Sequence, residues 1–267
     1  MTAPLSYDDH MGNLKDKIVF ITGASSGIGE ATAYAFAAQG ARLLLAARRI
    51  ERLQALQPKL QEKGAAAVHA FALDVRNKAE VEKQLSGLPE TWKAIDVLVN
   101  NAGLSRGLEK LHEGKHQDWE EMIDTNIKGL LYVIRAVVPG MVARGRGHVV
   151  NLGSTAGEIT YPGGSVYCGT KAAEHSINDG LRQDLLGTPV RVTSIDPGMV
   201  ETEFSEVRFH GDKERAAKVY QGLTPLTPAD VADAIVWAVS RPVHVNIARV
   251  LMTSIDQANS LLFNRKQ

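Results

Sequence analysis

The chain has 267 residues, of which 44 % are hydrophobic and 22 % charged, and its 30 basic and 30 acidic side chains leave no net formal charge. This composition is typical of a globular domain with a full hydrophobic core, and the neutral charge excludes a global attraction to nucleic acid or to an anionic membrane. The single cysteine, Cys168, excludes an internal disulfide and leaves too few thiolates for a structural zinc site, so no metal site is predicted.

The first residues do not resemble a targeting segment, because Asp8 and Asp9 interrupt them and no long apolar run follows. Nowhere do 18 apolar residues run together, so no membrane span is expected. We predict an N-terminal extension over residues 1–14, one domain over residues 15–267, and a reducing, cytoplasmic location.

The first predicted strand, Lys17–Ile21, is a β-branched apolar run of the kind that is buried on both faces of a sheet. The sequence TGASSGIG at 22–29 follows it, and an Ala-rich helix then extends to Gly40. A strand, a glycine turn and a helix place free N–H groups and a positive dipole end where a diphosphate can bind, although a merely structural turn is the alternative. The candidate dinucleotide-binding residues here are Gly23, Ser25, Ser26, Gly27, Ile28 and Gly29.

The second predicted strand, Ala41–Ala47, ends in Arg48 and Arg49. In a dinucleotide-binding βαβ unit an acidic residue at this point binds the ribose 2′-hydroxyl, whereas an arginine accommodates a 2′-phosphate. The two arginines therefore favour NADP over NAD as the cofactor. The alternative is that they only form the solvated start of an amphipathic helix, IERLQALQPKL.

The third predicted strand, Ala65–Leu73, leads to Asp74 and Val75. Asp74 is expected either to accept a hydrogen bond from an adenine amino group or to cap the helix that begins near Asn77. The fourth strand, 95–99, continues into NNAG at 100–103, which offers amide donors and space at the edge of the sheet where open α/β sheets bind ligands.

A long helix is predicted from Trp119 to about Arg144, and it carries Asn126 among apolar neighbours. A buried amide requires hydrogen-bond partners. We expect either a helix kink satisfied by water or a water molecule held in a proton relay. Glycines end this helix, and a fifth strand, His148–Leu152, follows.

The segment NLGSTAGEITYPGGSVYCGTK at 151–171 carries the candidate chemistry. Ser154 lies at a strand tip, and Tyr167 and Lys171 lie one turn apart on the same helix face. An ammonium beside a phenol favours the phenolate, and a hydroxyl directed at the same point can orient a carbonyl or a carbinol. The alternative is structural, because this spacing is common on helices.

A sixth strand, Val190–Ile195, precedes a long connection near 199–227 that is predicted to be a substrate lid. The lid carries a basic cluster, which indicates either an anionic substrate or a solvated helix face: Arg208, His210, Lys213 and Arg215. A helix from Thr227 to Trp237 and a seventh strand, Arg249–Met252, complete the pattern. Alternating strands and helices predict an α/β fold, a Rossmann-like, doubly wound parallel sheet of seven strands with helices on both faces, in a single domain.

TGASSGIG at 22–29, NNAG at 100–103, Asn126, Ser154 and YCGTK at 167–171 together resemble the short-chain dehydrogenase/reductase family over nearly the whole chain. Four further segments resemble its NADP-dependent 3-hydroxy acid dehydrogenases, also described as serine or L-allo-threonine dehydrogenases. They are LLLAARRIERL at 43–53, MIDTNIKGL at 122–130, VETEFSEVRFHGD at 200–212 and TPADVADAI at 227–235.

The resemblance implies that Tyr167 is the acid/base, that Lys171 favours its phenolate and holds the nicotinamide ribose, that Ser154 orients the substrate oxygen, and that Asn126 supports a water relay. It also implies that Ser154, Tyr167 and Arg208 face the substrate. Further cofactor-binding positions that it implies are Asp74, Val75, Asn101, Ala102, Gly103, Pro197, Gly198, Val200 and Thr202. Cys-Gly-Thr stands before Lys171 where the family often has Ala-Ser, and Cys168 is expected to be a packing residue.

The implied protein is a cytoplasmic homotetramer that transfers a hydride between NADP and a small 3-hydroxy acid, such as serine, L-allo-threonine or 3-hydroxypropionate, or the corresponding 3-oxo acid or semialdehyde. Two alternatives remain open at this point. One is an NADPH-dependent reductase of a neutral carbonyl compound, and the other is a non-catalytic NADPH-binding sensor.

Overall fold

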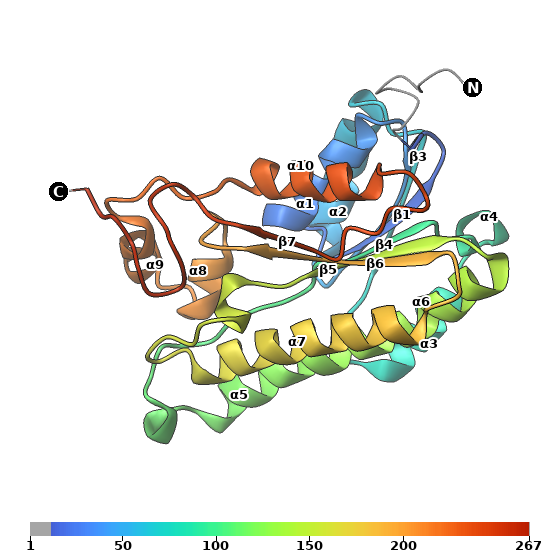
Figure 1. Cartoon of the computed structure of the whole chain (residues 1–267). Coiled ribbons are helices and arrows are strands. Elements are labelled where there is room, and N and C mark those ends of the chain that lie inside the picture. Colours follow the sequence, from blue (N-terminus) through green and yellow to red (C-terminus); the bar gives the residue numbers. More distant parts are fainter. Residues whose placement is uncertain (1–11, 267) are drawn as a thin grey trace, which may run out of the picture.

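Seven parallel strands form the centre of the molecule in a computed structural model that describes residues 12–266 (Figure 1). Their order across the sheet is β3-β2-β1-β4-β5-β6-β7, which confirms the predicted doubly wound arrangement. The strands are β1 (Ile18–Thr22), β2 (Arg42–Ala47), β3 (Ala67–Ala72), β4 (Val97–Asn100), β5 (Gly147–Leu152), β6 (Val190–Pro197) and β7 (Arg249–Met252).

Helices cover both faces of this sheet (Figure 1). One face is covered by α1 (Gly27–Ala37), α2 (Ile50–Glu62) and α10 (Pro228–Val239). The other is covered by α3 (Lys78–Ser86), α6 (Leu130–Arg144) and α7 (Ser165–Asp184), with α5 (His116–Ile123) beside α7. The short helices α4 (Glu90–Lys93), α8 (Phe204–Arg208) and α9 (Lys213–Tyr220) lie in connections.

Strand β1 is apolar along nearly its whole length because both of its faces are buried. All five residues of β1 are buried, and alternate side chains enter different core clusters. Ile21 packs on the side of α1 and α10, whereas Phe20 packs on the side of α6. Val19 of β1 pairs with Leu43 of β2, and this register brings the strand ends to one edge of the sheet.

The long helical stretch begins at His116, three residues before the predicted start, and widens into a π-helical turn over Asp124–Gly129. By length and composition the stretch His116–Arg144 is apolar enough to cross a membrane. Its residues Val133, Val137 and Met141 are, however, buried against the sheet, as they are in the core helix of a globular domain.

Both ends of the described chain contact the domain. Gly12 N donates a hydrogen bond to Ser240 O (2.6 Å), and Leu14 is buried in the core, whereas residues 1–11 of the predicted extension lie outside the described residues. After β7 the C-terminal tail, residues 253–266, returns toward the lid. The Gln257 side chain accepts a hydrogen bond from Met199 N (2.7 Å), and the Asp256 carboxylate accepts one from Thr224 N (2.8 Å).

Candidate active site

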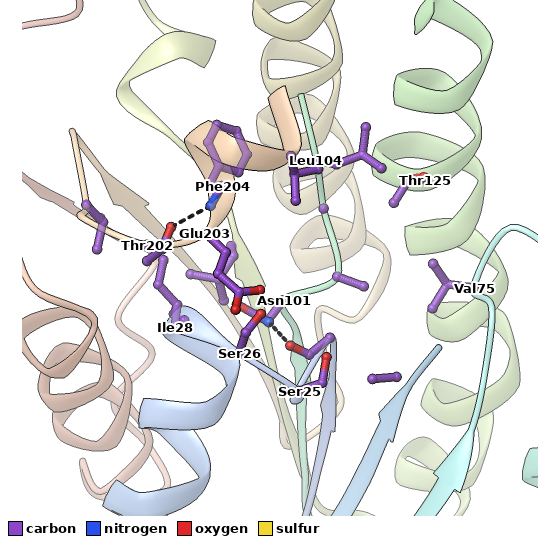
Figure 2. Close-up of a pocket in the computed structure, with 18 of the residues that line it drawn as sticks. Ser25, Ser26, Ile28, Val75, Asn101, Leu104, Thr125, Thr202, Glu203 and Phe204 are labelled. Carbon is purple, nitrogen blue, oxygen red and sulfur yellow. Dashed lines mark hydrogen bonds between the residues drawn. The ribbon is translucent and has the colours of Figure 1, made fainter. Parts of the chain in front are cut away.

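A cavity of about 340 Å³ opens at the carboxyl edge of the sheet (Figure 2). Of the residues predicted to bind a cofactor or to act in catalysis, Gly29, Asn126 and Arg208 do not line it. The predicted residues that do line it are Gly23, Ser25, Ser26, Gly27, Ile28, Arg48, Arg49, Asp74, Val75, Asn101, Ala102, Gly103, Ser154, Tyr167, Lys171, Pro197, Gly198, Val200 and Thr202.

The glycine turn between β1 and α1 forms one wall of the cavity and fits tightly against the end of β4. A side chain at Gly29 would collide with the Gly23 carbonyl and lie 2.5 Å from Asn101 Nδ2. The Asn101 amide donates to Thr22 O (2.9 Å) and so joins the two strand ends. The first N–H groups of a helix have no partner within it, and Gly27 at the start of α1 faces the cavity. This wall therefore fits a diphosphate.

Arg49 lies at the mouth of the cavity between the glycine turn and the lid. Its guanidinium donates to Ser26 Oγ (2.8 Å) and Ser25 Oγ (3.3 Å) and pairs with Glu203 Oε2 (3.0 Å). Arg52, one turn farther along α2, pairs with Glu203 Oε1 (2.7 Å) and does not line the cavity. Hydrogen bonds from Arg52 and Arg49 lower the pKa of Glu203, although burial opposes them. The two serines and the arginine form a donor set that suits a phosphate.

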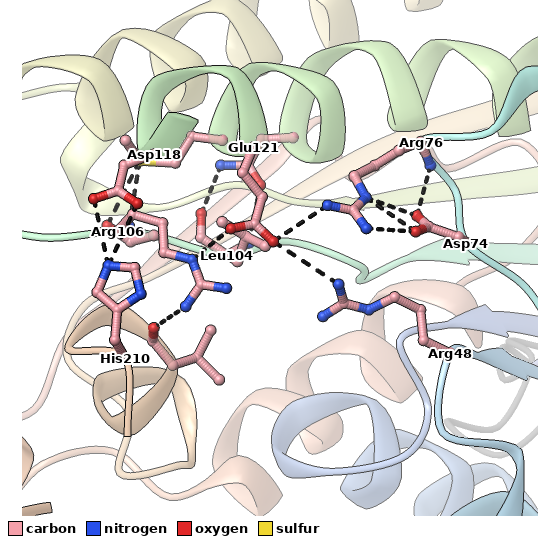
Figure 3. Close-up of polar contacts among 12 residues, drawn as sticks. Arg48, Asp74, Arg76, Leu104, Arg106, Asp118, Glu121 and His210 are labelled. Atoms are coloured by element: carbon pink, nitrogen blue, oxygen red, sulfur yellow. Dashed lines mark hydrogen bonds and ion pairs between the residues drawn. The ribbon is translucent and has the colours of Figure 1, made fainter. Parts of the chain in front are cut away.

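Arg48 also faces a second charged group, in which Arg76 lines the cavity whereas Glu121 and Arg106 lie outside its lining (Figure 3). Glu121 of α5 lies 3.9 Å from Arg48, 3.2 Å from Arg76 and 2.7 Å from Arg106. The Arg106 guanidinium, with smaller contributions from Arg76 and Arg48, holds the pKa of Glu121 below its usual value. Because Arg106 also donates to Val207 O of the lid, Glu121 links the Arg48 end of the cavity to the lid.

The Asp74 carboxylate is bound by the neighbouring Arg76 and not by the N-terminus of a helix. Arg76 donates to both of its carboxylate oxygens, at 2.6 to 3.0 Å, and these bonds lower its pKa although burial opposes them. The prediction that Asp74 caps the following helix is wrong, because the N-cap of α3 is Asn77, which accepts a hydrogen bond from Glu80 N (3.1 Å). The contact of Asp74 with adenine stays a prediction.

Ser154, Tyr167 and Lys171 come together at the inner end of the cavity, and each is less than 9 % exposed. Ser154 is placed by the end of β5, and its Oγ accepts a hydrogen bond from Ala156 N (3.1 Å). Lys171 Nζ donates to Leu152 O (2.6 Å) and pairs with Glu174 Oε2 (2.7 Å). Burial disfavours the charged ammonium, but Glu174 and then Tyr167 outweigh it and raise the pKa of Lys171.

Asn126 is held in the π-helical turn by protein groups. Its amide donates to Leu104 O (2.8 Å) and Thr170 Oγ1 (3.0 Å), and its oxygen accepts from Leu104 N (2.9 Å). Both predicted alternatives invoked water, whereas these partners come from the loop after β4 and from α7. Through Thr170, Asn126 contacts the helix that carries Tyr167 and Lys171.

The lid lies over the catalytic end through Phe204 and Arg208. The Phe204 ring is 5.6 Å from the Tyr167 ring, and the Arg208 guanidinium lies 5.3 Å above the same ring. Arg208 also donates to Tyr161 Oη (2.8 Å), and burial raises the pKa of that phenol. Within residues 12–266 the buried Nε of Arg208 has no hydrogen-bond partner.

The predicted basic cluster of the lid does not gather at one point. His210 lies 3.4 Å from Asp118, and the Arg215 guanidinium lies over the Phe209 ring at 4.3 Å. Neither these residues nor Lys213 line the cavity. Arg208 is therefore the member of the cluster that reaches the predicted catalytic residues.

A buried charged group supports the floor of the cavity behind Gly153. Asp196 of β6 accepts hydrogen bonds from Ser194 (2.6 Å) and from Arg249, and its carboxylate lies 3.1 Å from His175 Nε2. Burial raises the pKa of Asp196, but hydrogen bonds from His175 and Ser194 outweigh it and lower the pKa. A side chain at Gly153 would collide with this carboxylate.

Six charged side chains near the site were not predicted from the sequence: Arg52, Arg76, Arg106, Glu121, Glu174 and Glu203. Two of them carried a local signal. Arg52 follows Arg49 by three residues and so lies on the same face of α2, and Glu174 follows Lys171 by the same spacing. The pairing of Glu203 with Arg49 joins residues 154 positions apart, so no local signal existed.

Comparisons with known proteins agree with this geometry. A family model described as short chain dehydrogenase matches residues 17–213. The chain is 52 % identical to the "NADP-dependent 3-hydroxy acid dehydrogenase YdfG" of Salmonella typhi over 242 residues, which cover 90 % of this chain and 96 % of that protein. It is 43 % identical to the "Serine 3-dehydrogenase" of Rhizobium radiobacter over 240 residues, 90 % and 94 % of the two chains. The structure titled "The Closed form of serine dehydrogenase complexed with NADP+" matches with a TM-score of 0.88 and 48 % identity, covering 94 % of this chain and all of that one.

Proposed function

Because the chain belongs to the short-chain dehydrogenase family, we propose that it transfers a hydride between NADP and the carbinol carbon of a small 3-hydroxy acid. It is an NADP-dependent oxidoreductase that acts on CH–OH groups. The observation that carries the proposal is the convergence of Ser154, Tyr167 and Lys171 in one cavity whose mouth is lined by Arg48 and Arg49.

The residues present fit the cofactor. The glycine turn leaves no room for a Cβ at Gly29 and exposes the start of α1, which suits a diphosphate. Ser25, Ser26 and Arg49 supply hydroxyl and guanidinium donors at the cavity mouth, which suits a 2′-phosphate. When bound, the nicotinamide supplies the acceptor or donor of the hydride.

The protein residues move the proton. In the oxidation, the Tyr167 phenolate accepts the proton of the substrate hydroxyl while the carbinol hydrogen departs as hydride and the carbon–oxygen double bond forms. The Ser154 hydroxyl orients the substrate oxygen. The Lys171 ammonium favours the phenolate, and it is kept charged by its partners within the buried site. In the reverse direction Tyr167 returns the proton to a 3-oxo acid or a semialdehyde.

Arg208 is the candidate partner of the substrate carboxylate. Its guanidinium lies over the Tyr167 ring, and its Nε is buried without a partner in the described part of the chain. A carboxylate bound there would satisfy this donor and place the C3 hydroxyl of a short acid near the phenol. Replacement by methionine, which keeps an apolar stem, is expected to raise KM for the hydroxy acid about tenfold or more and to leave KM for a neutral alcohol little changed.

A turnover panel tests the proposal. Serine, allo-threonine and 3-hydroxypropionate are each offered with NADP+ and with NAD+, beside neutral alcohols of similar size. Turnover of the acids with NADP+ is the expected result, whereas preference for the neutral compounds would favour a carbonyl reductase. The Tyr167→Phe variant is expected to bind NADPH and to lose turnover, and a wild-type chain that binds NADPH without turnover would indicate a sensor.

A cytoplasmic homotetramer is part of the same proposal. Among the exposed apolar side chains, Ile123 and Leu131 lie on the α5–α6 stretch, and Leu251 and Ile255 lie at β7 and the tail. Two such regions on one chain fit an assembly with two kinds of interface. Sedimentation equilibrium is expected to give four times the mass of the chain.

A further inference from the structure

Glu174 forms a buried ion pair with Lys171 that the catalytic scheme above does not use. The two residues are 3 % and 7 % exposed, and the carboxylate lies 2.7 Å from Lys171 Nζ. This ammonium is the only hydrogen-bond partner that the described chain gives to the Glu174 side chain. The spacing of three residues on α7 places Glu174 on the same helix face as Lys171.

Stability alone does not account for this pair. Burying two charges costs several kcal/mol each in desolvation, and well-packed apolar side chains often stabilise such a position at least as well. The geometry instead constrains the ammonium. Of its three N–H groups, one is directed to Leu152 O and one to Glu174, which leaves a single direction for the third. Lys171 lines the main cavity, so that third group is available to the site.

Glu174 also lines a second, small cavity of about 10 Å³. Asn126, Asn100 and Thr22 line it as well, together with apolar residues such as Val75, Leu130 and Val133.

Three other ionisable groups act on the Lys171–Glu174 pair. On α7 they are Tyr167 and His175, and from β6 it is Asp196, whose negative charge also acts on both members of the pair. Asp196 is compensated by Arg249 of β7, which in turn pairs with Glu158 (2.9 Å). Burial raises the pKa of Glu174 and Lys171 opposes that effect. Glu174 is thus the carboxylate that contacts the catalytic ammonium directly.

We propose that Glu174 is a positioning residue that holds the Lys171 ammonium charged and directed into the cavity. The inference rests on the proposed function, in which the phenolate is the base. Burial disfavours a charged lysine, and the Glu174 carboxylate offsets that cost by pairing with Nζ, so the pKa of Lys171 is raised. Without Glu174 the ammonium is expected to lose its proton at lower pH and to turn away from the cavity, and the phenolate then loses its cationic partner.

The test is the Glu174→Gln variant, which keeps the shape and one acceptor and removes the charge. Two readouts follow the charge of Lys171: the alkaline limb of the pH profile of kcat/KM for oxidation, and the pH dependence of the Kd of NADPH, because Lys171 lines the cofactor cavity. Both midpoints are expected to fall by about one pH unit, since the carboxylate no longer raises the pKa of Lys171. The matched control is Asp179→Asn, which removes an exposed carboxylate paired with Arg182 at the same i,i+3 spacing on α7 (2.7 Å). It is expected to move neither readout.

Glu174→Asp covers the case in which the glutamine variant does not fold. It retains the charge and shortens the reach, so both midpoints are expected to stay near those of the wild type while kcat falls. Unchanged midpoints in Glu174→Gln, or equal shifts in Asp179→Asn, would overturn the inference. If the wild type turns over no hydroxy acid but the NADPH midpoint of Glu174→Gln still falls, the inference about Glu174 is retained and the proposed substrate is rejected.

Discussion

Replacement of Arg49 by alanine tests whether the cavity mouth distinguishes NADPH from NADH. Arg49 contacts Ser25 and Ser26 within the cavity and pairs with Glu203 at its edge. Its side chain is 40 % exposed, so solvent weakens each of these interactions. Arg52→Ala is the matched control, because Arg52 pairs with the same carboxylate and is 44 % exposed but does not line the cavity.

The expected size of the effect follows from these contacts. A guanidinium hydrogen-bonded to a phosphate contributes about 1.5–3 kcal/mol when the pair is well formed. Because Arg49 is partly exposed and must leave Glu203, we expect a loss of about 2 kcal/mol, or roughly 30-fold in the Kd of NADPH. NADH carries a hydroxyl at this position, so its Kd is expected to rise no more than about threefold.

The assay is the quenching of tryptophan fluorescence on titration with NADPH and NADH, at low and at moderate salt. The loss for NADPH is expected to shrink as salt is added, because the pair is exposed. Equal losses for the two cofactors would refute the assignment of Arg49 to the 2′-phosphate. A loss in Arg52→Ala as large as that in Arg49→Ala would show that the general positive field of α2, rather than the contact, is responsible.

Three further predictions concern single residues. In the same titration, Glu203→Gln is expected to lower the Kd of NADPH about threefold, because the carboxylate that competes for Arg49 is removed. The Kd of NADH is expected to change little. Gly153→Ala is expected to lower the Tm sharply, since the added methyl group collides with a buried carboxylate of β6, whereas Gly180→Ala on α7 meets open space and should stabilise by about 0.5–1 kcal/mol. Burial, and then Arg191, hold the pKa of His148 well below its ordinary value, so the unfolded chain takes up a proton that the folded chain does not, and the urea midpoint is expected to fall as the pH drops below about 6.5.

Each of these has a contrary outcome. Weaker NADPH binding in Glu203→Gln would mean that the lid carboxylate holds Arg49 in place for the phosphate. A Tm in Gly153→Ala equal to that in Gly180→Ala would mean that the floor of the cavity can adjust. A pH dependence of unfolding that is the same in His148→Gln as in the wild type would assign the acid sensitivity to another group.

The strands and the glycine turn were predictable because their signals are local. Strands buried on both faces are continuous apolar runs, and the turn after β1 needs glycine where Gly29 meets the Gly23 carbonyl. Seven strands in the predicted chain order were confirmed, with ends that differ by one or two residues. The π-helical turn around Asn126 was not predicted, because the amide is held by a loop and a helix that only the tertiary fold brings together.

The charged partners at the site were harder to predict than the residues they contact. Asp74 carried two interpretations, adenine binding and helix capping, whereas in the structure its carboxylate accepts hydrogen bonds from Arg76, two positions away. Glu121 and Glu203 meet arginines that are distant in sequence, and such choices depend on packing that no periodicity records. Arg52 and Glu174, by contrast, stand three residues after Arg49 and Lys171, a spacing that is visible in the sequence.

The C-terminal tail fixes both ends of the lid, which bears on any replacement of the lid by a segment from another enzyme. It accepts a hydrogen bond from Met199 through Gln257 at the start of the lid segment, and it contacts Thr224 through Asp256 near the end. Both ends of the lid are therefore hydrogen-bonded to the C-terminal tail, and α8 and α9 lie between these two anchors. Exchange of the segment 200–223 for that of another family member is therefore expected to keep both anchors as long as the tail is left intact.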